Sequence, residues 1–311
     1  MRGSSTAGIV PAYIGICVIW GTTWLAIKVG LQFAPPITSV GARFALAGLA
    51  LLAVAVLRGE TRPLRALPWK LVAIMASCLF GLNYVLTYVA EQGLASGLTA
   101  ILFGTMPFFT FFFRRLLLAE RATGNVWIGT VLAFCGVGVI SLVAGTRGAL
   151  PYALAIVGAA VLAAFANVYA KRHSDVAPLT VLPPAMLLAG SVVGTVGIAW
   201  ERPDIHAFLA PASLGAVLYL ALVGSALAFF LNSWLLQRID VSILNLVALI
   251  IPVIAVFVGV MFGSETVRPS ELAGATLVLA GMWYALGRRA PANLVPVPAP
   301  CSSTPRKDCT Q

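Results

Sequence analysis

Four asparagine side chains lie inside long apolar stretches of the sequence, at Asn83, Asn167, Asn232 and Asn245. Lipid offers an amide no hydrogen-bond partner, so each needs either a polar group on a neighbouring helix or a water-filled cavity. A bond between helices would explain each one singly. Four amides close to hydroxyl and aromatic side chains favour instead a cavity that binds a small molecule. The candidate binding residues are Trp20, Thr23, Asn83, Tyr84, Tyr88, Thr105, Pro107, Asn167, Tyr169, Phe229, Asn232, Asn245 and Pro252.

Two basic residues, Lys28 and Arg43, also fall within apolar stretches. Long basic side chains near a helix end usually extend to the membrane interface, and this explains both residues without any function. The alternative is that they attract a carboxylate or phosphate group of a substrate. The sequence leaves both interpretations open.

Pro107 and Pro252 occupy matching positions within two apolar stretches. A proline inside a helix removes one backbone hydrogen bond and frees a carbonyl group. Interrupted helices at paired positions are typical of transport sites, and a purely structural kink is the other explanation.

No arrangement of residues predicts catalysis or a bound metal. The sequence has neither an HExxH nor a GxSxG motif, and its five cysteines form no CxxC pair. No Asp or Glu is expected deep in a helix, because Glu91 is placed near a helix end. We therefore expect no cofactor, no metal site, no carboxylate proton relay and no enzymatic activity.

The composition indicates which elements must position these residues. Hydrophobic residues make up 60% of the 311 residues, charged residues only 10%, and the mean hydropathy is +0.98. A soluble domain has about 25% charged residues, and an apolar run of about 20 residues crosses the hydrocarbon core as a helix. The sequence predicts an all-α, polytopic membrane protein with ten transmembrane helices, over residues 10–30, 37–57, 71–90, 97–117, 125–143, 150–170, 180–200, 212–235, 242–262 and 271–287.

The basic residues between these helices predict the orientation. With a cytoplasmic N-terminus, 15 of the 20 Lys and Arg residues fall on the cytoplasmic side. This excess follows the positive-inside rule, so both termini are expected in the cytoplasm. The net charge of +10 is then an insertion signal, and no nucleic-acid partner is expected.

The chain contains an internal repeat with a constant offset of 145 positions. Identical residues occur at Gln92 and Gln237, Pro107 and Pro252, Phe112 and Phe257, Glu120 and Glu265, Gly129 and Gly274, Leu132 and Leu277, and Gly136 and Gly281. Each half has five predicted helices, an odd number, so the second half is expected upside down relative to the first. Inverted repeats are common in secondary transporters, whose site lies where the repeats meet.

Two glutamates of this repeat, Glu120 and Glu265, precede the fifth and tenth predicted helices. We expect each to satisfy the first turn of the helix that follows it, or to pair with Arg121 or Arg268. The repeat also sets the expected organisation: a cytoplasmic tail at 1–9, five-helix repeats at 10–143 and 150–287, and a disordered, Pro-rich cytoplasmic tail at 288–311.

Several motifs resemble the EamA-type family of drug/metabolite transporters over about residues 10–288. They are Trp20-Gly21-Thr22-Thr23-Trp24 running into Ala26-Ile27-Lys28, Ala42-Arg43-Phe44, Pro107-Phe108-Phe109-Thr110, Leu117-Leu118-Ala119-Glu120-Arg121 and Gly263-Ser264-Glu265. Ala119 stands where the family usually has glycine. The resemblance implies a central cavity lined mainly by the first, third, fourth, sixth, eighth and ninth helices, and export of small metabolites such as amino acids across the bacterial inner membrane.

The predicted function is therefore a secondary transporter working by alternating access, with a small-molecule substrate and the lipid bilayer as partners. A nucleotide-sugar or sugar-phosphate carrier is the alternative within transport, and Lys28 and Arg43 would then gain importance. A membrane-embedded enzyme, or a channel, is the alternative from another class. The sequence does not determine the substrate, the coupling ion or the oligomeric state.

Overall fold

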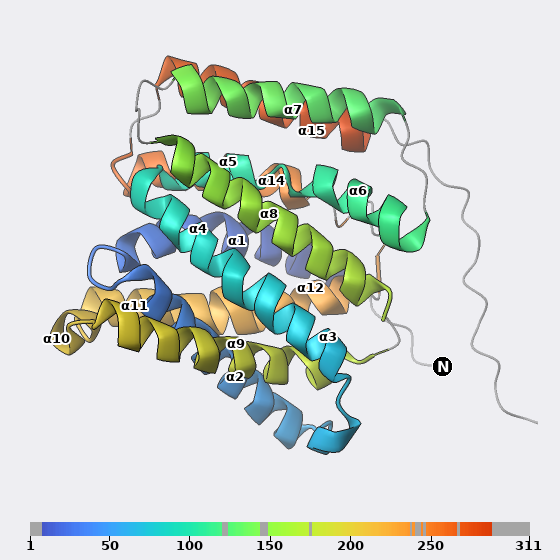
Figure 1. Cartoon of the computed structure of the whole chain (residues 1–311), viewed down its shortest axis with the longest axis vertical. Coiled ribbons are helices and arrows are strands. Elements are labelled where there is room, and N and C mark those ends of the chain that lie inside the picture. The colour runs from blue at the N-terminus through green and yellow to red at the C-terminus, as the bar shows by residue number, and fades with distance from the viewer. Residues whose placement is uncertain are drawn as a thin grey trace, which may run out of the picture.

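A computed structural model describes residues 8–119, 124–143, 149–173, 176–236, 238–239, 244, 247–265 and 268–287. Helices make up all the regular structure of these residues, as predicted (Figure 1). The main helices are α1 (Ile9–Gly30), α2 (Pro36–Leu57), α3 (Trp69–Ile74), η3 (Met75–Gly81), α4 (Leu82–Gly93), α5 (Ser96–Phe103), α6 (Met106–Leu118), α7 (Gly124–Val143), α8 (Ala149–Lys171), α9 (Pro178–Glu201), α10 (Ile205–Phe208), α11 (Pro211–Leu218), η4 (Tyr219–Leu227), α12 (Ala228–Leu236), α14 (Val247–Phe262) and α15 (Pro269–Gly287). Outside the described residues lie 1–7 of the expected N-terminal tail, the whole expected C-terminal tail, Glu120 and Asn245, whereas Ile9 of the expected N-terminal tail belongs to α1.

Prolines define where many of these helices begin. Pro36, Pro178, Pro211 and Pro269 are the first residues of α2, α9, α11 and α15. Proline fits this position because its fixed φ suits a helix and its missing N–H would have no intrahelical partner there.

Seven helical stretches are long and apolar enough to cross a membrane. They are Ile9–Gly30, Pro36–Leu57, Trp69–Gly93, Ser96–Leu118, Leu150–Lys171, Pro178–Glu201 and Pro211–Leu235. Three shorter apolar helices cover Trp127–Val139, Val247–Phe262 and Leu272–Tyr284. All ten fall within or around the ten predicted ranges, but length and composition support a membrane crossing for seven.

Two of the spans contain a π-helical segment that the sequence did not predict. η3 joins α3 to α4, and η4 joins α11 to α12. Moving η3 by the repeat offset of 145 places it on Leu220–Ala226, inside η4. The backbone therefore repeats as well as the sequence. Single π turns widen a helix and are frequent at functional sites.

The contacts between helices follow the same repeat. α2 packs against η4, and its equivalent in the second half, α9, packs against η3. α2 and α9 also pack against each other in antiparallel directions, with Gly41 opposite Gly194 and Ala45 opposite Gly190. A Cβ atom at Gly41 would overlap the Cα of Gly194. Gly190 and Gly194 therefore allow the two helices to pack closely.

α7 and α15 form a second antiparallel pair, side by side at one edge of the bundle (Figure 1). A Cβ at Gly136 would lie 2.5 Å from the carbonyl oxygen of Gly274, and one at Gly281 would lie 2.5 Å from that of Gly129. Only glycine allows the backbones to approach so closely.

Candidate functional site

The Arg43 side chain projects from α2 into the interior of the bundle, where only 1% of its surface is exposed. Its Nε donates a hydrogen bond of 2.8 Å to Ser225 Oγ, and its guanidinium carbon lies 4.5 Å from the centre of the Tyr84 ring. Its Nη1 has no hydrogen-bond partner. Burying a cation costs several kcal/mol, in order-of-magnitude terms, unless an anion compensates it. The arrangement therefore favours binding of an anionic group at Arg43.

Elements from both halves of the chain build the surroundings of Arg43. α4 supplies Tyr84 and Tyr88, and the Tyr88 hydroxyl interacts with the guanidinium group. The π-helical segment η4 supplies Ser225. The neighbouring Gly224 is required there, because a Cβ atom would lie 2.8 Å from Cγ2 of Thr23 and 3.6 Å from Nη2 of Arg43. The site thus lies where the two sequence repeats meet.

Lys28 lies in the last turn of α1 and is partly exposed. Its ammonium group donates hydrogen bonds of 2.6 and 2.8 Å to the backbone carbonyl oxygens of Glu91 and Leu94. These are unpaired carbonyls at the end of α4, and a basic side chain there stabilises the helix end. Lys28 thus holds α1 against the α4–α5 connection. For Arg43 the interface interpretation is wrong, because the guanidinium is buried among aromatic rings.

Glu91 lies near a helix end, as predicted, but in surroundings that the sequence did not indicate. It lies close to the end of α4, but its side chain is completely buried, at 0% exposure. Both carboxyl oxygens lack a hydrogen-bond partner. The sequence alone places this residue near a helix end and does not reveal that α1, α5 and the residues after α14 close over it.

Two other glutamates cap helices across the repeat. At the end of α9, Glu201 accepts hydrogen bonds from the backbone amides of Ile37 and Thr38, at 2.9 and 2.7 Å, and from Thr38 Oγ1 at 2.8 Å. Glu265 accepts bonds from Ser96 N and Oγ, at 2.8 and 2.9 Å. We expected Glu265 to serve the helix after it, but these bonds go to the first turn of α5 in the other half. A carboxylate there also complements the helix dipole.

The predicted amide residues have different environments. Asn83 is buried, and its Nδ2 donates to the Leu79 carbonyl oxygen within its own helix at 2.9 Å. Asn167 is exposed, and its Nδ2 lies 3.9 Å from the Met106 sulfur. Asn232 is half-buried, and Asn245 lies outside the described residues. The structure does not bring these amides together with Arg43 through any hydrogen bond among the described residues.

The predicted hydroxyl residues bond to their own helices. Thr23 Oγ1 donates to the Trp20 carbonyl oxygen and Thr105 Oγ1 to that of Leu102, both at 2.8 Å. Such local bonds satisfy a buried hydroxyl without a ligand.

The two predicted prolines differ in their effect on the helix. The helix is broken at Gly104 and Thr105, and Pro107 lies in the first turn of α6. Pro252, in contrast, lies inside the continuous helix α14. An interruption was expected at both prolines. It is present near Pro107 in the first half, whereas α14 continues through Pro252 without a break.

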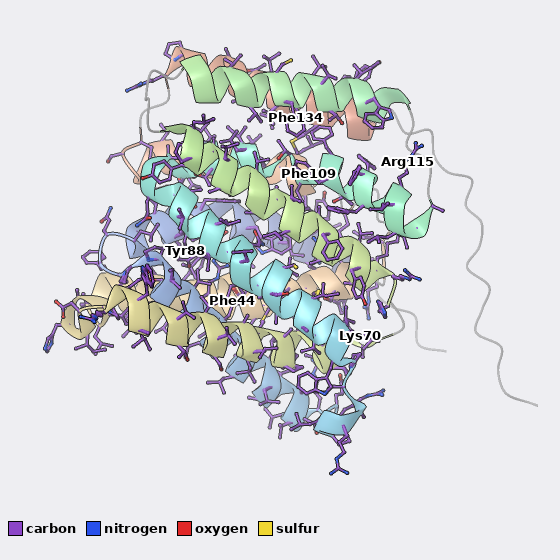
Figure 2. All side chains as sticks on the ribbon, viewed as in Figure 1. Phe44, Lys70, Tyr88, Phe109, Arg115 and Phe134 are labelled. Carbon is purple, nitrogen blue, oxygen red and sulfur yellow. The ribbon has the colours of Figure 1, made fainter. Side chains whose placement is uncertain are left out.

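The predicted aromatic residues fall into two groups. The Trp20 ring packs edge-on against Phe229, with centroids 5.7 Å apart, and Phe229 packs against Phe80 at 5.1 Å. Phe80 in turn contacts Phe44, which joins this group to Tyr84. Figure 2 labels Phe44 and Tyr88 within the bundle. Tyr169 belongs to a separate group with Phe165 and His173.

Ser225 is the contact of Arg43 that sequence reasoning left out of the site. It is a polar residue in an apolar stretch, and its partner lies 182 positions away in the sequence. The pair Gly224-Ser225 in an otherwise apolar run was the sequence feature that could have pointed to this residue. After the repeat offset is subtracted, the pair falls on η3 of the first half.

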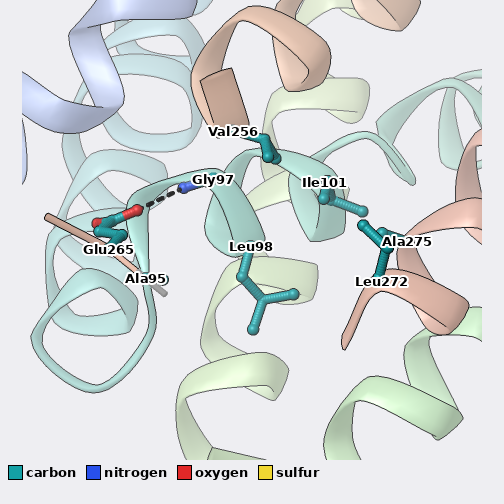
Figure 3. Close-up of a pocket in the computed structure, with 8 residues that line it drawn as sticks. All are labelled: Ala95, Gly97, Leu98, Ile101, Val256, Glu265, Leu272 and Ala275. Atoms are coloured by element: carbon teal, nitrogen blue, oxygen red, sulfur yellow. Dashed lines mark hydrogen bonds between the residues drawn. The ribbon is translucent and has the colours of Figure 1, made fainter. Parts of the chain in front are cut away.

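A small cavity lies beside α5, enclosed by Ala95, Gly97, Leu98, Ile101, Val256, Glu265, Leu272 and Ala275 (Figure 3). Its volume of about 30 Å³ is enough for one or two water molecules but not for a metabolite. Within the described ranges, no three His, Cys, Asp or Glu side chains are grouped to hold a metal ion.

Comparison with known proteins agrees with this picture. The sequence profile of the EamA-like transporter family matches residues 7–142 and 150–287. The chain is 31% identical over 300 residues to the uncharacterized inner membrane transporter YedA of Escherichia coli (strain K12), covering 93% of this chain and 94% of that protein. It is 26% identical over 277 residues to an uncharacterized transporter of Archaeoglobus fulgidus, covering 87% and 95%.

A relative of a different name is protein PagO of Salmonella typhimurium (strain LT2), 29% identical over 247 residues, covering 78% of this chain and 80% of that protein. A solved crystal structure with 21% sequence identity superposes with a TM-score of 0.68, over 92% of this chain and 100% of the other. This likeness shows a shared fold. The names of the family and of YedA describe transporters rather than enzymes.

Proposed function

The chain belongs to the EamA-like transporter family and is a multi-pass inner membrane transporter, and from this premise we propose that it exports small metabolites carrying a carboxylate group, such as amino acids, by alternating access. The observation that carries the substrate class is the buried guanidinium of Arg43, whose Nη1 has no partner among the described residues.

The proposed architecture is ten transmembrane helices in two inverted five-helix repeats, within residues 10–143 and 150–287. Two observations support it. The antiparallel packing of α2 on α9 and of α7 on α15 joins equivalent helices of the two halves. The three apolar helices outside the seven long spans fall at the remaining predicted positions. Equivalent helices that run in opposite directions are what an inverted repeat requires.

The proposed orientation places both termini in the cytoplasm. Fifteen of the 20 basic residues favour it through the positive-inside rule. Lys70 and Arg115 are two of these fifteen residues. They lie toward the same end of the bundle, on the right in Figure 2. Lys70 lies at the start of α3, at one end of the span Trp69–Gly93. The α4–α5 connection follows the other end of this span and then faces the periplasm.

A carboxylate suits Arg43 better than a phosphate does. A sugar-phosphate or nucleotide-sugar carrier must balance two or more negative charges, and Lys28 was the second candidate cation. Its ammonium group donates to two backbone carbonyl oxygens, which leaves Arg43 as the buried cation available to a ligand. The planar guanidinium matches carboxylate and phosphate geometry alike, so the number of available cations decides between them.

Counterflow in proteoliposomes tests this proposal. Vesicles containing the purified protein are loaded with unlabelled compounds, and uptake of labelled amino acids, hydroxy acids, sugar phosphates and nucleosides is measured. We expect uptake of carboxylate compounds in wild type and its loss in Arg43→Gln. Uptake confined to sugar phosphates would contradict the substrate class, and an unselective leak of all compounds would indicate a channel.

A further inference from the structure

Arg43 and Glu91 are ionisable groups of opposite charge. Both are buried, and no hydrogen bond joins them. Arg43 Nη1 and both carboxyl oxygens of Glu91 lack hydrogen-bond partners, so the two side chains are not bonded to one another. Two buried, opposite and unpaired ionisable groups close together are unusual, because each alone carries a large desolvation cost.

The spacing along α4 places Glu91 about one helical turn from Tyr88, a residue that contacts Arg43. Tyr88 interacts with the Arg43 guanidinium, and Glu91 follows Tyr88 by three residues. Side chains at positions i and i+3 of a helix are neighbours on one face, with Cβ atoms about 5–6 Å apart. Arg43 and Glu91 also act on one another electrostatically.

The groups around Glu91 come from every side of α4. Lys28 is on α1, Arg43 on α2, Tyr84 and Tyr88 on α4 itself, and Tyr152 of α8 packs against Gly93. Glu265, after α14, is a further negative charge in the vicinity. Lys28 uses its ammonium group on the backbone, and none of these groups donates a hydrogen bond to the Glu91 carboxyl.

A carboxyl group in this position is stable only when its charge is neutralised. Burial is the largest influence on this group: without a hydrogen-bond donor, an ionised Glu91 would bear a large desolvation cost, which the charges of Lys28 and Arg43 offset only in part and which Glu265 increases. Two things can neutralise it: a proton, or a cationic group of a ligand. A molecule carrying a carboxylate for Arg43 and, close to it, an ammonium group for Glu91 satisfies both residues at once.

We propose that Glu91 is an exchange site, which binds a proton when no substrate is present and the ammonium group of a zwitterionic substrate when its carboxylate is on Arg43. Substrate and proton then compete for one carboxylate. In an alternating-access carrier such competition produces exchange of one proton for one substrate, so an inward proton gradient drives export. This inference rests on the proposed function and deepens it to zwitterions and to proton antiport.

The test is efflux of a labelled mixture of the twenty common L-amino acids from proteoliposomes. With wild type, the rate of efflux should be severalfold higher when the outside is at pH 6 and the inside at pH 7.5 than when both sides are at pH 7.5. In Glu91→Gln, exchange should be slower and the ratio of the two rates should fall to about one. Glu60→Gln, an exposed acid in the loop after α2, is the matched control and should behave as wild type.

Each other outcome has a defined meaning. Exchange in wild type without any effect of the pH gradient, or a gradient effect retained in Glu91→Gln, would overturn this inference and leave the proposed function intact. No exchange of any amino acid in wild type would overturn this inference, and no exchange of 2-hydroxy acids either would overturn the proposed function as well. A labelled mixture of 2-hydroxy acids, which lack the ammonium group, should show no acceleration by the gradient.

A second measurement covers the case in which Glu91→Gln does not fold or does not transport. Dicyclohexylcarbodiimide, an apolar reagent for protonated carboxyl groups, should modify Glu91 but not Glu60 in wild type, and the amino-acid mixture should reduce the modification. Peptide mass spectrometry locates the adduct. If Glu91 is not modified at pH 6, or is not protected by amino acids, the inference is wrong.

Discussion

Ala119 and Ser264, which lie 145 positions apart, share the same unusual backbone conformation, with φ angles of 54° and 52°. Ala119 ends α6, and Ser264 follows α14, so each closes an equivalent helix in one of the halves. Left-handed backbone is costly for any residue with a Cβ atom and almost free for glycine. The conformation fits the glycine that the family resemblance implies at the position of Ala119.

This relationship predicts that glycine stabilises both turns. Ala119→Gly and Ser264→Gly should each raise the free energy of unfolding by about 1 kcal/mol, because the left-handed strain disappears. Thermal unfolding of the detergent-purified protein measures the effect. Gly15→Ala, inside α1 with no atom within 4 Å of the added Cβ, is a control for substitution at an unstrained position. A lower unfolding temperature in both glycine variants would contradict the strain argument.

The contact between α2 and α9 predicts a large effect of a single methyl group. In Gly41→Ala the new Cβ would overlap the backbone of Gly194, so the helices must separate along an interface that buries Arg43 and Phe44. We expect destabilisation of about 1–3 kcal/mol, as for overpacking. Gly15→Ala is again the matched control, and an equal unfolding temperature in the two variants would show that α2 and α9 are not in such close contact.

The cap that Glu201 forms on α2 predicts a defined loss in Glu201→Gln. The amide keeps one acceptor oxygen and turns the other into a donor, which faces the N–H groups of Ile37 and Thr38. Hydrogen bonds to a charged acceptor contribute about 1.5–3 kcal/mol, and the cost should lie in that range. Unfolding in parallel with Glu60→Gln measures it. An effect no larger than that of the control would show that the cap does not join the halves.

Arg43 predicts a graded loss of transport. Arg43→Lys keeps the charge but loses the planar fork and the Nε bond to Ser225, whereas Arg43→Gln removes the charge. We expect kcat/KM for counterflow to fall about 10-fold in the first and about 100-fold in the second, equal to about 1.4 and 2.7 kcal/mol. Arg62→Gln, in the exposed loop after α2, should be unchanged. Equal activity of all three variants at matched protein amounts would remove Arg43 from the site.

Much of the fold could be predicted because it depends on local patterns. Apolar runs and prolines located the helices, and the glycines that repeat at Gly136 and Gly281 lie where helices touch. The π-helical segments could not be predicted, because a change of one residue per turn leaves the apolar composition unaltered. Their matching positions become visible only in the backbone.

The site was predicted in part. Arg43, Tyr84 and Tyr88 were named and do lie together, whereas Ser225 was left out, since contacts over 182 positions leave no local signal. Glu91 was dismissed because burial of a side chain near a helix end depends on which other helices cover it. The cap from Glu265 was assigned to the wrong helix for the same reason: the nearest helix in sequence is not the nearest in space.

The central claim is that two equivalent halves cross the membrane in opposite directions. Single cysteines at Ala119→Cys and Ser264→Cys, in a background with the five native cysteines replaced, place one reporter in each equivalent turn. A membrane-impermeant maleimide applied to intact spheroplasts should label S264C, and it should label A119C only after the membrane is opened. Labelling of both positions from the same side would contradict the inverted arrangement and, with it, the transport mechanism.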